Sequence, residues 1–405
     1  MKSARAFFSF ALALAAAGCS PQHPCATPLT KGPWVERVDD THATILWESA
    51  SPGCVEAAFA AESGGKPQVA IGSSTETHVV SSWGINQVKQ PDLPGTYYRD
   101  EIPLSGLEPS TCYTYRLASS GSMYSGDQNG RFCTARPSGA DFTFMGVGDT
   151  NPILGHTLPT FKYTLATKPD FIVHLGDMQY YSSAAETWVY WFGAMAPMLR
   201  SGALFPTVGN HENENDGTEY DDYYGRLFVP ASMDTTTRWY HYETGGVWFF
   251  SIDTEEPLDA GSEQTTWLGQ ALVGAQQQPG FRFSIVYMHR PLYTLGDTSP
   301  ELTARQVLEP MFMATGVKLV IAGHMHGYER FETPSGITYV TCAGGGGIIN
   351  DVNANVGNYP NDAPLRVAVS DHYHDCLYAV TAGKISSTVI DELGATIDHF
   401  DKAVP

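Results

Sequence analysis

Positive charge is scarce in this chain of 405 residues, which has 23 Lys and Arg against 43 Asp and Glu and a formal net charge of −20. Charged residues make up only 16% of the sequence, compared with about 25% in a typical soluble protein. A surface this acidic repels nucleic acid and anionic membranes, so we expect neither as a direct partner. The sequence has no basic cluster that could attract a phosphorylated ligand, whereas a metal site could supply the positive charge.

After its N-terminus the sequence has no apolar segment long enough to predict a membrane-spanning helix. Two basic residues precede an apolar run over residues 7–17, which is typical of a secretory signal. The next residues, Ala-Gly-Cys19, resemble a bacterial lipobox, although the position three places before the cysteine holds Ala instead of Leu. We therefore expect residues 1–19 to be a signal peptide and Cys19 to be lipidated in an exported periplasmic or cell-envelope lipoprotein. The alternative is ordinary signal-peptidase cleavage near Ala17, which would give a secreted protein.

Only seven cysteines are present, and none belongs to a Cys-x-x-Cys pair, which argues against a cysteine zinc site. An odd number of cysteines is unfavourable in an oxidising compartment, but lipidation of Cys19 would leave six for three disulfides. Several pairings of these six are possible. Their order along the chain favours Cys25–Cys54, Cys112–Cys133 and Cys342–Cys376.

Glycine and proline are frequent, at 40 and 26 residues, which predicts many turns and argues against a helical bundle. Between residues 28 and 137, turn residues separate short strands with period-two alternation, such as Thr44–Trp47 and Thr111–Leu117. The segment Leu104–Tyr115 resembles the turn and strand of fibronectin type III modules. We expect a small all-β sandwich here. It carries no catalytic constellation, and we interpret it as a packing or positioning module.

The pattern changes after Ser138, where apolar strands alternate with helical stretches up to about residue 400. Nearly continuous apolar strands indicate a sheet buried on both faces, hence an α/β domain with layers of helix, sheet and helix. The predicted strands are Phe142–Val147, Phe171–Leu175, Leu204–Val208, Val247–Ile252, Phe283–Met288, Leu319–Ala322 and Ile337–Thr341, and the predicted helices are Thr187–Arg200, Gln264–Gln276 and Pro300–Met313. The end of the chain, Leu377–Phe400, returns to alternating strands.

Polar residues with ligand chemistry follow five of the predicted strands. These segments are Gly148-Asp149, Gly176-Asp177 with Tyr180, Gly209-Asn210-His211, Met288-His289 and Gly323-His324-Met325-His326. The carboxyl ends of strands form the ligand-binding edge of an open α/β sheet, and glycine permits the close backbone approach that such a site requires. Each segment alone also fits a turn or a core histidine. Together, two Asp, one Asn, three His and a Tyr at one edge predict a metal site.

In this order the segments form a motif set that resembles that of the binuclear metallophosphoesterases. Tyr180, the segment His324–Arg330 and the fibronectin-like domain in front narrow the resemblance to the purple acid phosphatase branch. The resemblance covers about residues 31–400. It implies a fibronectin type III-like domain over residues 28–137. It also implies a catalytic domain over residues 139–400, with a layered α/β fold in which a β-sandwich is flanked by helices.

The resemblance also implies which side chains hold two metal ions. Fe(III) would be bound by Asp149, Asp177, Tyr180 and His326, and a divalent Fe, Zn or Mn ion by Asp177, Asn210, His289 and His324. Asp177 would bridge the two ions. The donor chemistry agrees, because phenolate and carboxylates suit a trivalent ion, whereas imidazole and amide oxygen suit a divalent one.

The function implied is hydrolysis of small phosphate monoesters by a metal-bound hydroxide. His211, next to Asn210, is expected to orient the phosphate and to protonate the leaving alkoxide, or else to be a structural histidine nearby. A phosphodiesterase or nucleotide-cleaving enzyme on the same centre is the alternative. A non-catalytic surface lipoprotein, in which the β-sandwich carries the function, is a less favoured one.

Some positions depart from the family pattern. Asp149 is followed by Thr-Asn instead of the glycine that many members have two places later, and His289 lacks the extra histidines that plant-type members place nearby. Substrate selection is therefore assigned to other groups, namely Asn151, Glu212, Arg290, Tyr293 and Tyr328. Three further histidine segments are interpreted as structural, with His156 at a helix start, His174 in the core and residues 372–375 in a loop.

Overall fold

The computed structural model describes residues 29–78, 82–84, 88–90, 96–118, 129–180, 185–214, 223–229 and 238–405. The expected signal peptide, Cys19 and Cys25 lie outside these ranges, so export, lipidation and the Cys25–Cys54 pairing stay predictions. None of the helices within these ranges has the length and apolar character that crossing a membrane demands.

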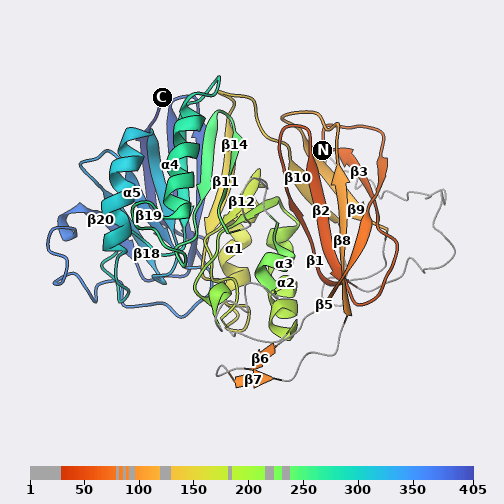
Figure 1. Ribbon diagram of the computed structural model, residues 1–405, viewed down its shortest axis with the longest axis horizontal. Coiled ribbons are helices and arrows are strands. Elements are labelled where there is room, and N and C mark those ends of the chain that lie inside the picture. The colour runs from red at the N-terminus through yellow and green to blue at the C-terminus, as the bar shows by residue number, and fades with distance from the viewer. Residues whose placement is uncertain are drawn as a thin grey trace, which may run out of the picture.

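The N-terminal part of the chain is an all-β sandwich, as predicted (Figure 1). One sheet has the order β1 (Leu29–Glu36), β2 (Ala43–Ser49), β8 (Thr96–Leu104) and β5 (Ser73–His78). The other has the order β10 (Asn129–Cys133), β9 (Cys112–Leu117), β3 (Glu56–Ala61) and β4 (Gln68–Ile71). A separate pair of strands is formed by β6 (Ser82–Gly84) and β7 (Val88–Gln90).

The C-terminal part contains two mixed sheets packed face to face. The six-stranded sheet has the order β13 (Ala203–Pro206), β12 (Phe171–His174), β11 (Phe142–Val147), β21 (His374–Thr381), β22 (Lys384–Asp391) and β23 (Thr396–Ala403). The seven-stranded sheet has the order β14 (Tyr240–Thr244), β15 (Val247–Ser251), β16 (Phe283–Met288), β17 (Val317–Ala322), β19 (Thr338–Cys342), β18 (Tyr328–Glu332) and β20 (Arg366–Ser370). The helical elements are α1 (Thr157–Leu165), α2 (Ala185–Leu199), α3 (Gly225–Leu227), α4 (Glu263–Gln276) and α5 (Leu302–Ala314), with short 3-10 turns η1 (His211–Asn213) and η3 (Ala363–Leu365).

These layers confirm the fold class of a β-sandwich flanked by helices and correct the simpler expectation of one sheet between helices. Phe144 and Phe171 stack with ring centroids 5.3 Å apart, and Phe249 of the opposite sheet meets Phe144 edge-on, also at 5.3 Å. Met145 and Ile172, on the other face of the same sheet, pack in a cluster with residues of α2. Strands β11 and β12 are therefore buried on both faces, by a helix on one side and by the second sheet on the other. A strand has the same apolar pattern whether it lies between two layers of helices or between a helix and a second sheet.

The seven strands and three helices predicted in this part all exist, with ends shifted by at most a few residues. The C-terminal alternating segment forms β21, β22 and β23, and the turn between the first two lies at Ala382–Gly383. Elements α3, β14, β18 and β20 were not predicted, and α1 was anticipated only through the helix start expected at His156. Of the missed strands, β14 forms one edge of the seven-stranded sheet, and β18 and β20 lie at the other. Half-exposed residues near the edge weaken the apolar pattern, as in β20.

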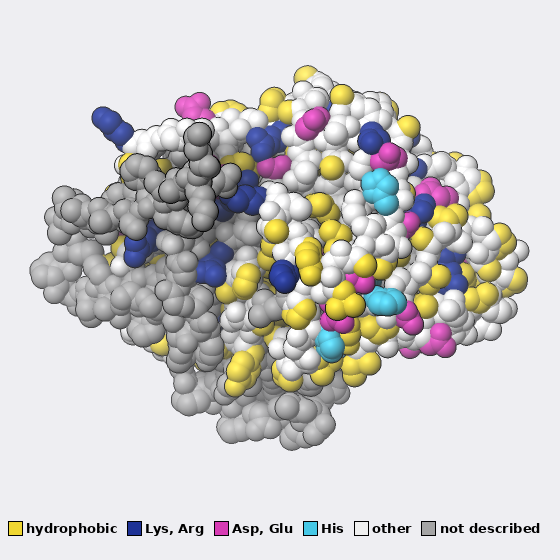
Figure 2. Space-filling model, turned by 180° about the vertical axis from the view of Figure 1, so that it is seen from behind, with side chains coloured by type: hydrophobic (Ala, Val, Ile, Leu, Met, Phe, Trp, Pro, Cys, Tyr) yellow, Lys and Arg dark blue, Asp and Glu magenta, His cyan; other side chains and the backbone are white. Residues whose placement is uncertain are grey.

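The face drawn in Figure 2 carries scattered charges. Among the described residues, Lys and Arg side chains lie interspersed with Asp, Glu and apolar side chains and do not gather in one large patch. This distribution agrees with the sequence, in which no basic cluster is present to attract a phosphorylated ligand.

The N-terminal sandwich lies beside α2 and α3 (Figure 1), and buried aromatic and charged groups join them. Trp34 of β1 contacts Phe192 of α2 at 4.9 Å between ring centroids and Phe228 after α3 at 6.0 Å. Glu48 of β2, which is fully buried, pairs with both Lys31 and Arg226. Loss of a cationic partner would leave the charge of this buried carboxylate uncompensated, which is strongly destabilising, so the contact with Arg226 favours keeping the two parts together.

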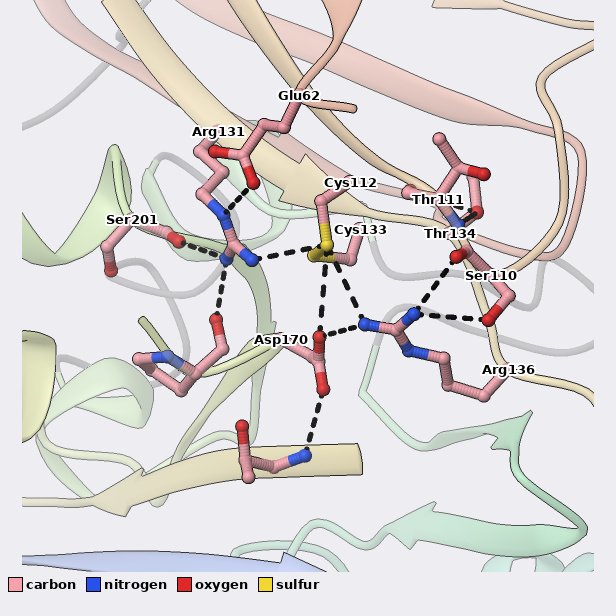
Figure 3. The surroundings of a disulfide bond; sticks show 12 residues. Glu62, Ser110, Thr111, Cys112, Arg131, Cys133, Thr134, Arg136, Asp170 and Ser201 are labelled. Carbon is pink, nitrogen blue, oxygen red and sulfur yellow. Dashed lines mark hydrogen bonds and ion pairs between the residues drawn. A yellow bond between two sulfur atoms is a disulfide. The ribbon is translucent and has the colours of Figure 1, made fainter. Parts of the chain in front are cut away.

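The disulfide Cys112–Cys133 lies at the same junction (Figure 3). It joins the neighbouring strands β9 and β10, which confirms this predicted pairing. Arg131 Nη1 donates to the carbonyl oxygens of Pro169, at 2.9 Å, and Ser201, at 3.3 Å, and Arg136 pairs with Asp170. These contacts fix the sandwich to the N-terminal ends of β12 and β13, opposite the ends at which the metal site is predicted.

The pairing Cys342–Cys376 is also confirmed. Cys342 ends β19 of the seven-stranded sheet, and Cys376 lies in β21 of the six-stranded sheet. The bond therefore ties the two sheets together, near the segments that follow β11 and β17. Both described disulfides agree with folding in an oxidising compartment.

Candidate metal centre

The five predicted strand ends lie at one end of the two packed sheets of the C-terminal part, although they come from different sheets. Strands β11, β12 and β13 run parallel in one sheet, and β16 and β17 run parallel in the other. Hydrogen bonds link the segments that follow them. The backbone N–H of Asp149 donates to Gly176 O at 3.0 Å, and that of Gly323 donates to His289 O at 2.8 Å. The side chains carried by these segments therefore converge.

One cluster contains Asp149, Asp177 and His326, whose ligand atoms all lie within 4.8 Å of one another. The hydroxyl of Tyr180 joins it, 3.1 Å from Asp149 Oδ1 and 2.8 Å from His326 Nε2. The other nitrogen of His326 bonds to Ile348 O at 2.7 Å, which leaves Nε2 directed at the cluster. This arrangement brings together the four donors expected for the first ion.

A second cluster contains Asp177, His289 and His324, again with ligand atoms within 4.8 Å of one another. Asn210 Oδ1 lies 3.1 Å from His289 Nε2 and so belongs to the same group. His289 Nδ1 bonds to Leu175 O at 2.8 Å, which orients the ring. Asp177 is the one residue common to both clusters, as expected for a bridging carboxylate.

The backbone at these positions explains why glycines accompany the ligands. Asp149, Asp177 and His324 have positive φ values of 62°, 50° and 69°, a conformation that is uncommon for residues with side chains and is found at functional sites. A Cβ added at Gly209 would lie 2.3 Å from Asp177 Oδ1, and one added at Gly323 would lie 2.7 Å from Asp149 Oδ2. Glycine is therefore required at both places for the ligand side chains to fit.

The charges at the centre favour a cation. Asp149 and Asp177 are almost fully buried. Burial opposes ionisation of Asp177, but His289 and His211 outweigh it and hold its pKa well below the usual range. Burial and His289 together lower the pKa of His324 to about 2, while Asp177 raises the pKa of His289 to about 10 against the effect of burial. Protonated His289 thus balances the charge of the buried carboxylates, and bound metal ions can take the place of its proton.

His211 begins the 3-10 turn η1 and lies against the first cluster. Its ring centroid is 4.5 Å from that of Tyr180, and its Nε2 is 3.8 Å from Asp177 Oδ2. Nδ1 pairs with Glu214 at 2.7 Å. Burial opposes protonation of this ring, but Asp177 and Glu214 outweigh it and raise the pKa of His211 to about 9. His211 is therefore held next to the centre as a protonated, partly exposed group.

The structure corrects the assignment of four residues to the substrate. Glu212 is fully buried and accepts backbone hydrogen bonds from Gly209, Asp177 and Met178 at 2.8–2.9 Å. Asn151 is 4% exposed, and its Oδ1 accepts from the N–H of Ile153, so it shapes the turn. The hydroxyls of Tyr293 and Tyr328 donate to Glu309 and Asp398, away from the metal clusters. All four are structural or positioning residues.

Arg290 is the remaining predicted substrate residue, and it does lie at the centre. Its Nη1 is 3.2 Å from His324 Nε2. The side chain is held by Glu255, a residue that sequence reasoning missed because 35 positions separate the pair. Glu214 was also missed, although its place three residues after His211 is a signal that could have found it.

The histidines interpreted as structural lie outside the two donor clusters that share Asp177, but the loop predicted for residues 372–375 is wrong in part, because His374 and Asp375 belong to β21. His174 is fully buried, with Nε2 3.0 Å from Thr150 Oγ1. His156 precedes α1, stacks on Tyr373 at 4.0 Å and pairs with Glu392. His374 is buried beside the Cys342–Cys376 disulfide.

Asp375, next to His374, provides a test of how burial affects pH dependence. It is fully buried, and burial raises the pKa of its carboxyl to about 8, although Thr164 donates a hydrogen bond to it. The unfolded chain would lose this proton near pH 4, so between about pH 4 and 8 the folded state binds more protons and its stability falls as pH rises. We expect Asp375→Asn to increase the free energy of unfolding at pH 8 by roughly 1–3 kcal/mol and to change it less at pH 5.

Denaturant unfolding at both pH values would measure this difference. Asp401→Asn, at an exposed position on β23, is the matched control and should stay within about 0.5 kcal/mol of the wild type. A loss of stability in Asp375→Asn at pH 8 would show that the buried carboxyl is ionised and favourable there.

Comparison with known proteins identifies relatives of this chain. Residues 142–328 match the family model of calcineurin-like phosphoesterases. Purple acid phosphatase 21 of Arabidopsis thaliana is 28% identical over 267 residues, which cover 60% of this chain and 57% of that protein. Phosphoenolpyruvate phosphatase of Allium cepa is 28% identical over 330 residues, covering 76% and 64%. The structure of a purple acid phosphatase from yellow lupin (Lupinus luteus) seeds is similar with a TM-score of 0.73 at 18% identity, covering 93% of this chain and 74% of that one.

The match to the family model begins at β11 and ends at the first residue of β18, so it includes all five ligand-bearing strand ends. The lupin structure is similar in fold over both the N-terminal sandwich and the C-terminal part. The chain spans less than two thirds of the length of the two sequence relatives named above. Residues 142–328 of the chain are thus similar to the calcineurin-like phosphoesterases, and the sequence relatives of the chain include purple acid phosphatases.

Proposed function

We propose that this protein is an exported, binuclear metal-dependent phosphatase that hydrolyses small phosphate monoesters. The observation that carries the proposal is the pair of donor clusters that share Asp177. Two clusters with one common carboxylate suit a pair of ions that act on one substrate. The names of the relatives, among them purple acid phosphatases and a phosphoenolpyruvate phosphatase, support a phosphatase over other esterases.

The donor set fits two unlike ions. Asp149, Tyr180 and His326 with Asp177 form a hard, anionic set suited to Fe(III), and Asn210, His289 and His324 with Asp177 suit a divalent Fe, Zn or Mn ion. Two carboxylates and one phenolate contribute −3 against +5 from such ions, which leaves about +2 at the centre. The burial of Tyr180 beside two carboxylates raises the pKa of its hydroxyl well above the ordinary value, so its ionisation requires a cation.

With two such ions held by these residues, the centre would polarise a phosphoryl oxygen and lower the pKa of water enough to supply a nucleophile near neutral pH. The side chains of the protein then have separate tasks. Asn210 and Asp177 orient the centre, and Glu212 holds the backbone of residues 177, 178 and 209 in the required turn. His211, protonated and 23% exposed, can donate to the phosphate and then to the leaving alkoxide.

The activity is tested with purified, metal-loaded protein on a 4-nitrophenyl phosphate monoester and on the corresponding bis(4-nitrophenyl) diester. We expect faster turnover of the monoester and two bound metal ions per chain by elemental analysis. Faster turnover of the diester would favour the phosphodiesterase alternative. Protein that binds no metal and hydrolyses neither ester after refolding with iron would leave the non-catalytic surface lipoprotein as the better account.

Tyr180 tests the identity of the first ion. If its phenolate binds Fe(III), charge transfer gives the purified protein a pink to purple colour, and Tyr180→Phe bleaches it while the protein stays folded. A visible absorption spectrum of both proteins measures this. A colourless, fully active wild-type protein that contains only zinc or manganese would contradict the Fe(III) proposal and leave the phosphatase proposal intact.

Export is proposed on the signal-like N-terminus and is supported by the two described disulfides. Attachment to a membrane would then depend on a lipid at Cys19. Mass spectrometry of the protein isolated from its native envelope tests this, because an unmodified N-terminus at another residue would contradict lipidation.

A further inference from the structure

Arg290 has a particular place at the metal centre. It follows His289 directly, and its Nη1 lies 3.2 Å from Nε2 of His324, so the guanidinium lies next to the second cluster. The side chain is 28% exposed, which makes it accessible to a substrate that enters from solvent. Of the five side chains predicted to select the substrate, Arg290 is the one that contacts a side chain of the centre.

Glu255 determines which edge of the guanidinium faces the centre. It accepts from Nε and, at 3.1 Å, from Nη2 of Arg290, while the backbone N–H of Arg290 donates to Thr254 Oγ1 at 3.1 Å. A guanidinium has five N–H donors in a rigid fork. The carboxylate occupies the Nε–Nη2 side of this fork, so the two N–H groups of Nη1 remain directed at the centre.

The pair is well shielded, which keeps this orientation. The Glu255 side chain is 12% exposed. An arginine guanidinium stays charged throughout the working pH range of a protein. A fixed cation with one free donor edge beside a metal cluster is suited to an anionic oxygen.

The chemistry of phosphate esters connects this edge to substrate choice. A monoester has three non-bridging oxygens and up to two negative charges, whereas a diester has two such oxygens and one charge. Two ions can each bind one oxygen of either ester. Only the monoester keeps a further anionic oxygen for another donor, because in the diester that place carries an organic group.

We propose that Arg290, oriented by Glu255, binds a non-bridging phosphate oxygen and makes the centre favour monoesters over diesters. This inference rests on the proposed phosphatase function. Arg290 contacts the substrate directly, and Glu255 is a positioning residue. The same contact would bind inorganic phosphate, the product of monoester hydrolysis.

The experiment compares kcat/KM on the 4-nitrophenyl monoester and the bis(4-nitrophenyl) diester for the metal-loaded wild type, Arg290→Ala, Arg290→Lys and Glu255→Gln. Arg290→Ala should lower kcat/KM for the monoester by about 10–100-fold, the value of one charge-assisted hydrogen bond, and that for the diester by less than about threefold. Arg290→Lys should recover part of the loss, since it keeps the charge without the fork. Glu255→Gln should also lower the ratio of the monoester kcat/KM to the diester kcat/KM, by a smaller factor than Arg290→Ala.

Two further measurements separate substrate binding from damage to the centre. Calorimetric titration with inorganic phosphate should show weaker binding to Arg290→Ala by a factor similar to the monoester loss, and elemental analysis should show two metal ions per chain in every variant. Arg131→Lys is the matched control. Arg131 is also paired with a glutamate, Glu62, but lies at the opposite ends of β12 and β13, so the ratio of the two kcat/KM values should not change.

The outcomes distinguish this inference from the proposal on which it rests. If the wild type hydrolyses neither ester, the proposed function fails. If the wild type is active but Arg290→Ala lowers both values equally, leaves the monoester value unchanged, binds phosphate as tightly as the wild type or loses a metal ion, the inference about Arg290 is wrong and the proposed function stands.

Discussion

Asp177→Asn is expected to remove both metal ions and to lower phosphate monoester turnover by on the order of 10³-fold or more. Asp177 is the residue that both donor clusters contain. It also accepts a hydrogen bond from the backbone N–H of His211 at 3.0 Å. The amide cannot carry the negative charge that two cations share, so each ion loses a ligand and the position of His211 is weakened as well. Elemental analysis and steady-state kinetics on the same preparation measure the effect.

Two variants serve as controls for this prediction. Asp149→Asn changes a carboxylate that belongs to only one cluster, so it should reduce occupancy mainly of the Tyr180-containing half of the centre. Asp253→Asn changes another fully buried carboxylate, paired with Arg238 and outside both clusters, and should retain two ions per chain. Retention of both ions by Asp177→Asn would contradict the assignment of a bridging carboxylate.

His211→Ala is expected to slow hydrolysis of an alkyl phosphate monoester far more than that of an aryl one. A phenolate leaves without a proton, whereas an alkoxide needs one, and general acid catalysis contributes roughly 10²–10⁴-fold. The position of His211 beside Asp177 and Tyr180 places its partly exposed ring where it can deliver that proton. We therefore expect a loss on the alkyl ester at least about tenfold larger than the loss on the aryl ester.

The comparison requires kcat/KM for both esters and metal analysis of the variant. His156→Ala is the matched control, because this histidine is also paired with a glutamate but lies at the start of α1, outside the metal clusters. Equal losses on the two esters would show that His211 orients the phosphate or supports the structure and does not donate the proton. Glu214→Gln should also lower kcat/KM more for the alkyl ester than for the aryl ester, by a smaller factor than His211→Ala, since Glu214 pairs with the His211 ring at 2.7 Å.

The residues proposed to bind the metal ions could be picked out from the sequence because their chemistry is local. The proposed ligands follow the buried strands after one to six residues, and glycine stands beside most of them. The strands are apolar over four to six residues and can be recognised individually. The parallel direction of β11, β12 and β13 then requires their carboxyl ends to lie together.

The groups that surround the ligands were harder to predict. Glu212, Asn151, Tyr293 and Tyr328 all have side chains that could bind a phosphate ester, and the sequence offers no way to know that each is already bonded elsewhere. Glu255 lies in a loop between β15 and α4, and only packing brings it to Arg290. Distant pairs of this kind leave no periodic signal in the chain.

The sequence by itself determined the strands, the ligand residue types and the close backbone approach that the glycines allow, because all three depend on neighbouring residues and on steric fit. The residue pattern itself left open whether the strands form two sheets and whether Asp177 is shared by two clusters. The family resemblance implied both, and the tertiary structure shows both. The tertiary structure also showed that, of the five side chains predicted to select the substrate, Arg290 is the one that contacts a side chain of the centre. The physical reason is that an apolar strand is buried equally well by a helix or by a second sheet, and that a polar side chain is occupied or available according to partners that lie far away in the chain.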